Sequence, residues 1–441
     1  MNKTEHTNKV DRPTLVISCP ASSRSGYGNH SRDLIRSLVE MEKFNVEVID
    51  QRWGTCPRTE LKKSENKDIS KLTVSSNMPK QPDVWMQVTV PNEFQPIGKY
   101  NIGITAGIET DRVSPQWLEG MNRMDMNIVP SEHSKLGFQC YYDKKDQEGG
   151  EVVSQLSLEK PIEVLFEGID TEIYNKTSKI EDSVTKKLSS IKEDFCFLLC
   201  GHWMNGEFLH DRKDIGGTIH TFLSTFLKLS DRNQPALVIK TGIAFSIPEE
   251  IAVKQKVADI MKNFSNANKR VPNIYIVWGD LSDSEMNSLY NHPKIKAMIS
   301  LTHGEGYGRP LAEFSVTGKP VIVTNYSGHL DFIAKHGILL EGELKQVHPS
   351  VVWDEVIVNH SQWFYVNYQY ASSVMKDVHK NYKAHAEKTR KQTKYMKDNF
   401  TLKKMTESFK DIMEKYTPEF SEVQNMDSFQ IPKLEELQTY E

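Results

Sequence analysis

The chain has 441 residues, which is long enough for two domains of ordinary size. Its 55 basic and 59 acidic side chains nearly balance, and 38% of its residues are hydrophobic. This composition is typical of a soluble globular protein. The near balance of charges excludes the strong excess of one sign that would make nucleic acid or a membrane an obligatory partner.

Residues 1–13 lack the apolar core of a signal sequence, and no run approaches the roughly 18 apolar residues that span a bilayer. We therefore expect a flexible N-terminus and a cytoplasmic protein without a transmembrane segment. The cysteines favour neither a disulfide framework nor a zinc site, because they are odd in number, scattered and without a Cys-x-x-Cys pair. They are Cys19, Cys56, Cys140, Cys196 and Cys200.

The first part of the chain alternates apolar runs typical of buried strands with helical segments. Thr14–Cys19 is the first such run, and a loop containing Gly26 and Gly28 leads from it into a helix. Residues 51–80 are polar and poorly periodic, which indicates an exposed excursion. Further strands are expected at 46–49, 83–90, 100–105 and 126–129, and from 162 onward. Strands that alternate with helices predict a parallel sheet.

The same alternation resumes after a polar stretch at 175–193, which indicates a linker followed by a surface helix. Phe195–Gly201 is a strand-like run, and Asp211–Ile215 leads from it into a helix. Arg212 and Lys213 therefore lie at a helix start, where cations oppose the helix dipole, which argues against a merely solvated position. Two more strands are expected, at 236–240 and 273–280.

The segment 295–324 carries the most informative pattern of the chain. Ile295–Leu301 is a short apolar run, and Pro310 lies where a helix would place its first residue. Gly318 ends that helix, and Val321–Thr324 is β-branched enough to form the next strand. The pattern predicts a strand, a crossover helix and a second strand in a parallel sheet.

Two carboxylates stand at a fixed spacing within this unit, Glu305 in the glycine loop and Glu313 in the helix. Carboxylates are good acceptors for the vicinal hydroxyls of a sugar or a ribose. Between them, Gly306, Tyr307 and Gly308 offer backbone N–H groups that suit an anion such as a phosphate. Each feature alone also fits a structural role, since the dipole at a helix start favours an acid and a turn favours glycine.

Taken together, Glu-Gly-Tyr-Gly-Arg-Pro-Leu-Ala-Glu at 305–313, followed by Gly-Lys-Pro-Val-Ile, resembles the donor-site signature of the retaining glycosyltransferases of family 4. The resemblance implies an α/β protein of GT-B fold, in which two Rossmann-like domains with parallel sheets face a central cleft. It also implies that the C-terminal domain holds most of a nucleotide-sugar. By analogy, Glu305 would contact the transferred sugar and Glu313 the ribose of the nucleotide.

The same resemblance implies the remaining donor contacts. Lys213 matches the family's phosphate-binding lysine, and either His202 or Arg212 contributes beside it, since the arginine that usually follows the strand is replaced by histidine here. A lysine and a planar arginine suit a departing diphosphate because it is a multiply charged anion. The glycine loop at Gly26 and Gly28 would approach the donor from the N-terminal domain.

The chain departs from the family at Glu109, because family members frequently have a histidine soon after this strand. We therefore expect an acid to line the cleft at this point. His133, at the start of a helix that Ser131 would cap, is more typical of a surface or satisfied side chain than of a catalytic one. We expect no metal site and no cofactor beyond the nucleotide-sugar donor, because the sequence has no convincing Asp-x-Asp motif.

These segments predict the following domain organisation. It comprises a flexible N-terminus at 1–13, an N-terminal acceptor-side domain at 14–175, a linker at 176–193, a C-terminal nucleotide-sugar-binding domain at 194–395, a helix at 396–416 that returns toward the N-terminal domain, and a tail at 417–441.

The sequence therefore predicts a metal-independent retaining glycosyltransferase that acts on a saccharide, a glycolipid or another hydroxyl acceptor. Alternative interpretations are a DNA-base glycosyltransferase, a non-catalytic protein that binds nucleotide-sugars or glycans, and an epimerase or phosphorylase on the same scaffold. The run from Lys376 to Lys404 holds ten basic residues against three acidic ones, which is typical of a solvated helix face. It leaves nucleic acid and peripheral membrane contact open without indicating either, and the sequence identifies neither the base nor the sugar of the donor.

Overall fold

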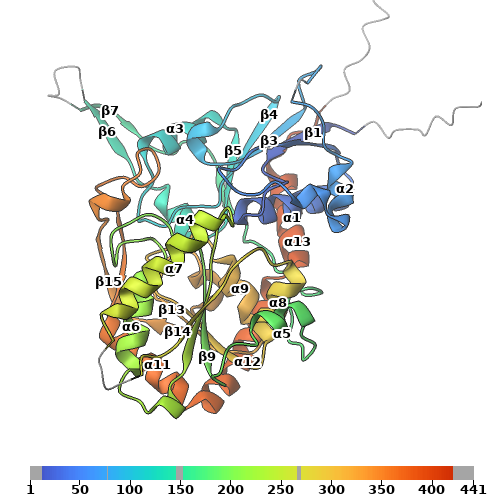
Figure 1. Ribbon diagram of the computed structural model, residues 1–441. Coiled ribbons are helices and arrows are strands. Elements are labelled where there is room, and N and C mark those ends of the chain that lie inside the picture. The colour runs from blue at the N-terminus through green and yellow to red at the C-terminus, as the bar shows by residue number, and fades with distance from the viewer. Residues whose placement is uncertain (1–11, 77, 146–151, 266–269, 421–441) are drawn as a thin grey trace, which may run out of the picture.

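The computed structural model describes residues 12–76, 78–145, 152–265 and 270–420. Within these ranges the chain forms two α/β domains, each built on a six-stranded parallel sheet, which confirms the predicted fold class (Figure 1). Residues 1–11 of the predicted N-terminus and 421–441 of the predicted tail lie outside the described residues.

The first sheet has the strand order β2-β1-β3-β4-β5-β8, and its pairs are parallel. Its strands are β1 (Thr14–Cys19), β2 (Asn45–Asp50), β3 (Val84–Val88), β4 (Tyr100–Ile104), β5 (Met126–Val129) and β8 (Ile162–Val164). Its helices are α1 (Gly26–Glu40), α2 (Lys67–Ser70), α3 (Pro115–Arg123) and α4 (Glu132–Gly137). Ser131 caps α4 by accepting a hydrogen bond from the backbone N–H of Ser134, as the sequence predicts.

The second sheet has the strand order β11-β10-β9-β12-β13-β14, again with parallel pairs. Its strands are β9 (Cys196–Cys200), β10 (Ala236–Lys240), β11 (Ile274–Val277), β12 (Ile295–Ser300), β13 (Val321–Thr324) and β14 (Ile338–Leu340). The helices around it are α5 (Asp182–Lys187), α6 (Ile215–Phe226), α7 (Ile247–Lys262), α8 (Asp283–Asn291), α9 (Arg309–Ser315), α10 (Leu330–Ile333), α11 (Tyr368–Lys380) and α12 (Tyr382–Asn399).

Strand order reverses near the centre of each sheet, between β1 and β3 in the first and between β9 and β12 in the second. Loops that leave the carboxyl ends of two such neighbouring strands run in opposite directions and open a crevice, which is where α/β proteins bind ligands. The glycine loop at 20–28 leaves one of these points, and the signature loop at 301–308 leaves the other.

Several local features were not predicted from the sequence. Antiparallel hairpins are formed by β6 (Tyr142–Lys145) with β7 (Val152–Leu156), and by β15 (Gly342–Gln346) with β16 (Gln362–Val366). Within the excursion at 51–80, the described residues form η1 (Glu60–Lys62), η2 (Ser64–Asn66) and α2, and Ile69 is buried in the N-terminal core. One buried apolar residue produces no periodicity, so the packing of this segment leaves no sequence pattern. The remaining 3-10 turns are η3 (Pro91–Glu93), η4 (Asp231–Asn233) and η5 (Pro349–Val351).

The last described helix, α13 (Leu402–Tyr416), crosses back to the N-terminal domain, and Figure 1 shows it beside α1. Met405, Phe409 and Met413 recur at a spacing of four residues and are buried in the same core as Leu34 and Leu38 of α1. The chain therefore passes between the domains twice, once near Ile169 and once near Phe400. The two crossings are hydrogen-bonded to each other, because the N–H of Ile169 donates to the carbonyl of Phe400 at 2.9 Å.

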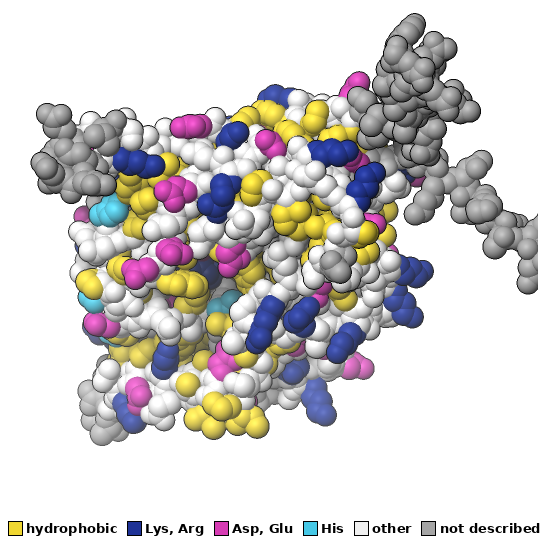
Figure 2. Space-filling view, turned by 90° about the horizontal axis from the view of Figure 1, so that it is seen from above, with side chains coloured by type: hydrophobic (Ala, Val, Ile, Leu, Met, Phe, Trp, Pro, Cys, Tyr) yellow, Lys and Arg dark blue, Asp and Glu magenta, His cyan; other side chains and the backbone are white. Residues whose placement is uncertain are grey.

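Basic and acidic side chains are interspersed on the face that Figure 2 views from the side of the N-terminal domain, so no field of one sign covers it. This agrees with the near balance of charges in the sequence. Across the described parts of the chain, no helix combines the length and the apolar character that crossing a membrane requires.

We predict that Phe409→Ala lowers the free energy of unfolding by about 3–5 kcal/mol, because it leaves a cavity in the N-terminal core. Lys410→Ala, on the exposed face of the same helix, is the matched control and should change stability by less than about 0.5 kcal/mol. Urea denaturation followed by circular dichroism measures both changes. Equal stability of the two variants would contradict the anchoring of α13.

Candidate active site

Two loops at the reversal point of the second sheet carry most of the predicted site residues. One joins β9 to α6 and holds His202, Arg212 and Lys213, and the other joins β12 to α9 and holds Glu305. The loops are hydrogen-bonded to each other, since the carbonyl of Arg212 accepts from the N–H of His303 at 2.9 Å. This bond holds the basic residues beside the signature.

Glu305 binds both cations of the neighbouring loop. The ammonium group of Lys213 donates to Oε1 of Glu305, and the Arg212 guanidinium donates to Oε2 at 3.3 Å. The backbone N–H of Glu305 is also fixed, because it donates to Oγ of Ser327 at 2.9 Å. The structure thus brings Glu305, Lys213 and Arg212 together in one cluster.

The carboxylate of Glu305 and the two cations stabilise each other's charged forms. Burial disfavours ionisation of Glu305, but Lys213 and Arg212 outweigh that effect and lower its pKa to about 2. Burial also lowers the pKa of Lys213 from its usual value, and Glu305 offsets only part of the shift. Glu305 is therefore a carboxylate at neutral pH, and two cations face the same small volume.

The cluster reaches across to the N-terminal domain through Glu109. The Arg212 guanidinium lies 3.1 Å from Oε1 of Glu109, so one side chain of each domain contacts this arginine. Glu109 of the N-terminal domain is thus in direct contact with the cluster. A histidine at this position could not form an ion pair with an arginine, whereas the Glu109 carboxylate does.

Glycines in the signature loop permit the two domains to touch. A Cβ atom on Gly304 would lie 2.2 Å from the carbonyl oxygen of Glu109, and one on Gly306 would lie 1.9 Å from that of Ala106. Both contacts are with backbone and cannot be relieved by a side-chain rotation. Oγ of Ser131 donates to the carbonyl of Gly306 at 2.6 Å, which adds a hydrogen bond between the domains.

This packing changes the interpretation of the glycines made from sequence. Gly306 is required by the approach of the other domain, whatever else its backbone contacts. Gly308 has a φ of 99° at the N-cap of α9, which favours glycine. Within the described chain, the backbone N–H groups of Gly306, Tyr307 and Gly308 have no hydrogen-bond partner, and the Tyr307 ring is buried against Phe332.

A second buried network surrounds Glu313 and was missed by the sequence analysis. Arg309 donates to Glu313 at 3.0 Å and to Asp33 of α1 at 2.7 Å, and it lies 3.8 Å from Glu167. Tyr290 donates to the other oxygen of Glu313 at 3.0 Å. The network joins the signature helix to the N-terminal domain. A charged Asp33 directly before the buried Leu34 was the signal available in the sequence.

Two carboxylates of this network hold their protons unusually strongly. Burial raises the pKa of Glu313 to about 7, and Arg309 opposes the shift only in part. Burial raises the pKa of Glu167 to about 7 in the same way, and its Oε2 has no hydrogen-bond partner among the described residues. Glu313 therefore titrates near neutral pH, whereas Glu305 does not.

His202 lies beside the cations but does not share their charge. Burial lowers its pKa to about 4, and Lys213 and Arg212 add to the shift. At neutral pH the ring is thus uncharged, and its buried Nδ1 has no partner within the described chain. Despite burial, Glu109 and Glu305 raise the pKa of Arg212, which is therefore the second cation of this loop beside Lys213. His202 can offer only a hydrogen bond.

The predicted glycine loop lies at the start of α1 in the N-terminal domain. Gly26 begins α1 with open space around it, whereas a Cβ atom on Gly28 would lie 2.2 Å from the carbonyl of Ser23. The hydroxyl of Tyr27, between them, accepts a hydrogen bond from the N–H of Ala106 at 3.0 Å. The loop is thereby connected to the segment that contacts Gly306.

His133 lies on α4 close to this contact. Burial lowers its pKa to about 4, and its ring lies edge-on to Tyr326 at 4.8 Å between centroids. Among the described residues, no group of three or more histidine, cysteine or carboxylate side chains could hold a metal ion.

Comparison with solved structures finds this architecture in other proteins. A glycosyltransferase from Rickettsia africae ESF-5 matches with a TM-score of 0.60 and 15% identity over 93% of this chain and 100% of that one. Sucrose-phosphate synthase from Thermosynechococcus elongatus matches at 0.57 and 11%, over 92% and 99%. Anabaena HepE in complex with UDP-glucose matches at 0.56 and 11%, over 92% and 100%.

The fold is GT-B. No family model matches the sequence, and no curated protein matches it closely enough to count as a relative. The cluster at Glu305 and the network at Glu313 each combine residues of both domains, and the N-terminal domain contributes Glu109, Asp33 and Glu167.

We predict that Glu313 makes the stability of this GT-B protein depend on pH. Because the folded state keeps this proton up to about pH 7, whereas the usual value is 4.5, the contribution is fully present below about pH 4.5 and is lost as the pH rises through 7. Glu313→Gln should remove a decrease on the order of 2–3 kcal/mol between pH 5 and 8. Burial raises the pKa of Glu167 too, so this residue also lowers stability as the pH rises. Part of the pH dependence therefore remains in Glu313→Gln.

Urea denaturation at pH 5, 6, 7 and 8 measures this effect. Glu119→Gln, at an exposed position on α3, serves as the control and should follow the wild-type curve. If Glu313→Gln also follows the wild-type curve, Glu313 is not held protonated by its surroundings.

Proposed function

We propose that the protein is a retaining glycosyltransferase of family 4 that transfers a sugar from a nucleotide-sugar to a hydroxyl acceptor. The observation that carries this proposal is the cluster of Lys213 and Arg212 on the carboxylate of Glu305, at the reversal point of the C-terminal sheet. The resemblance of the 305–313 signature to that family supports it. The likeness of the fold to HepE, a protein that was crystallised with UDP-glucose, supports it as well.

In the proposed reaction, Lys213 and Arg212 neutralise the charge that develops on the departing nucleoside diphosphate. Such preorganised cations in a site that excludes water contribute more than they would in solution. They also supply the positive charge that a metal ion supplies in other transferases, which is the basis for proposing a metal-independent reaction. His202, being uncharged, would contribute a hydrogen bond to a phosphate oxygen.

The carboxylates would position the donor. Glu305 would accept hydrogen bonds from hydroxyls of the transferred sugar, and Glu313 would accept them from the ribose. The unpaired N–H groups of Tyr307 and Gly308 would face the diphosphate, and the loop at Gly26 and Gly28 would approach it from the N-terminal domain. Correct placement of the reacting atoms then contributes much of the rate acceleration.

The transfer step needs no covalent intermediate with the protein. The bond between the anomeric carbon and the diphosphate oxygen breaks, and the acceptor oxygen bonds to the same carbon from the same face. The acceptor proton passes to the departing phosphate oxygen. The product therefore keeps the anomeric configuration of the donor.

We predict that one nucleotide-sugar in a panel of uridine, guanosine and adenosine donors releases nucleoside diphosphate in the presence of the protein. Lys213→Ala, Arg212→Ala and Glu305→Ala should each lower this rate by about 100-fold or more, since each removes a group that acts on the developing charge or the sugar. His202→Ala should lower it by less than about tenfold, since an uncharged group contributes less.

Lys391→Ala, an exposed change on α12, is the control and should retain the wild-type rate. Binding of a nucleotide-sugar without release from any donor would support a binding protein and contradict the transferase proposal. An equal loss in His202→Ala and Arg212→Ala would contradict the assignment of Arg212 as the second cation.

A further inference from the structure

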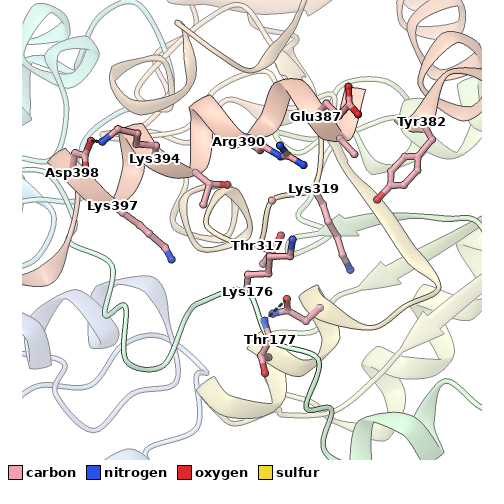
Figure 3. A pocket seen from close by; sticks show the side chains of 14 residues that line it. Lys176, Thr177, Thr317, Lys319, Tyr382, Glu387, Arg390, Lys394, Lys397 and Asp398 are labelled. Carbon is pink, nitrogen blue, oxygen red and sulfur yellow. Dashed lines mark hydrogen bonds and ion pairs between the residues drawn. The ribbon is translucent and has the colours of Figure 1, made fainter. Parts of the chain in front are cut away.

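A groove of about 640 Å³ lies on the C-terminal domain, away from the site described above. Figure 3 shows α12 along one side of it, with Arg390, Lys394 and Lys397 on the helix, and Lys176 and Lys319 on the opposite side. The volume lies within the range of roughly 300–1,000 Å³ that small-molecule sites occupy. Arg390, Lys394 and Lys397 belong to the basic run at 376–404, for which the sequence indicated no binding role.

Positive charge is concentrated here, because five basic side chains and only two acidic ones, Glu387 and Asp398, line the groove. Asp398 is already paired with Lys394 at 2.7 Å. The charged ends of Lys176, Arg390 and Lys397 form neither an ion pair nor a hydrogen bond within the described residues. The linker and α12 thus bring three unneutralised cations to one hollow, which an anionic ligand would stabilise.

Lys319 lines the groove and is itself hydrogen-bonded. Lys319 donates from its amine to the carbonyls of Tyr290 and His292 at 2.6 and 3.0 Å, where α8 ends. Burial lowers the pKa of Lys319 to about 7, and Lys296 adds to the shift. A nearby anion would favour the charged form of this lysine.

The groove also adjoins both crossings between the domains. Asn291 holds the linker in place, because its side chain accepts from the N–H of Thr177 at 3.1 Å and donates to the carbonyl of Asn175 at 2.8 Å. The opposite wall, α12, runs into the second crossing at Phe400. A ligand that contacts both walls would therefore tie the linker to α12 close to the hinge.

The wall formed by α12 is attached to the signature helix as well. Thr393 donates to the carbonyl of Ser315 at 3.0 Å, and Thr389 donates to that of Gly318 at 2.8 Å. Ser315 is the last residue of α9, the helix that carries Glu313. The groove and the cleft thus share one element.

We propose that this groove binds a soluble small molecule bearing phosphate groups, and that its occupation restrains the hinge between the two domains. Phosphate oxygens suit the site because lysine and arginine side chains bind them through charge-assisted hydrogen bonds. The inference concerns a second site and does not depend on the reaction proposed for the cleft.

The test titrates inorganic pyrophosphate into the full-length protein by calorimetry at low ionic strength. Arg390→Ala/Lys397→Ala should weaken binding by about tenfold or more, since two bonds to charged groups are lost. Lys388→Ala/Lys391→Ala removes the same charge from exposed positions of α12 outside the groove and should change affinity less than about twofold. Lys213→Ala, which alters the cleft, should leave this binding in place.

Amide hydrogen exchange supplies a second readout, because pyrophosphate should slow exchange at 175–177 and 399–402 in the wild type and not in Arg390→Ala/Lys397→Ala. Equal weakening by both double variants would show a general charge effect and overturn the proposal. Loss of all binding in Lys213→Ala would assign the anion to the cleft alone and overturn it too. Binding of the protein to phosphatidylglycerol vesicles without binding of pyrophosphate would contradict a soluble ligand.

Discussion

The ion cluster around Glu305 is the interaction on which the rest of this structure depends. Glu305 holds Lys213 and Arg212 on one side, and Arg212 reaches Glu109 of the other domain. Burying four charges together is unfavourable unless each is paired, and such clusters are weak contributors to stability. The transfer that we propose gives these charges a role, because Lys213 and Arg212 would neutralise the departing diphosphate.

The local backbone is arranged to permit this cluster. Gly304 and Gly306 allow the carbonyls of Glu109 and Ala106 to approach closely, so the domains meet where the ions are. The second network, centred on Arg309, repeats the arrangement from α9 to Asp33 of α1. Two independent sets of charges thus connect the signature to the N-terminal domain, and α13 fixes the same two domains together through its buried methionines and Phe409.

The sequence predicted the central strands of both sheets well, because they are buried and read as continuous apolar runs, as Thr14–Cys19 does, whereas the partly buried edge strand β14 was not predicted. The resemblance to a family assigned Glu305 and Lys213 to one donor site, and the structure adds a direct ion pair between them. The hairpin of β15 and β16 was missed, because its outer strand is exposed at every position from Gly342 to Gln346 and lacks an apolar pattern.

The sequence did not predict how deeply each side chain is buried or which charges lie beside it. The choice between His202 and Arg212 depends on burial and neighbouring cations, which only the folded structure places together. Gly306 was interpreted as a phosphate-binding position, whereas its lack of a side chain is required by Ala106 of the other domain. Glu167 escaped notice because nothing in its local sequence indicates that Arg309 lies beside it.

The most direct test of the account is a crystal structure of the protein with the nucleotide-sugar that it accepts best. We predict that the diphosphate lies against Lys213 and Arg212, the sugar hydroxyls against Glu305, and the ribose against Glu313. A nucleotide-sugar bound elsewhere, with the ion pairs of Glu305 unchanged, would contradict it.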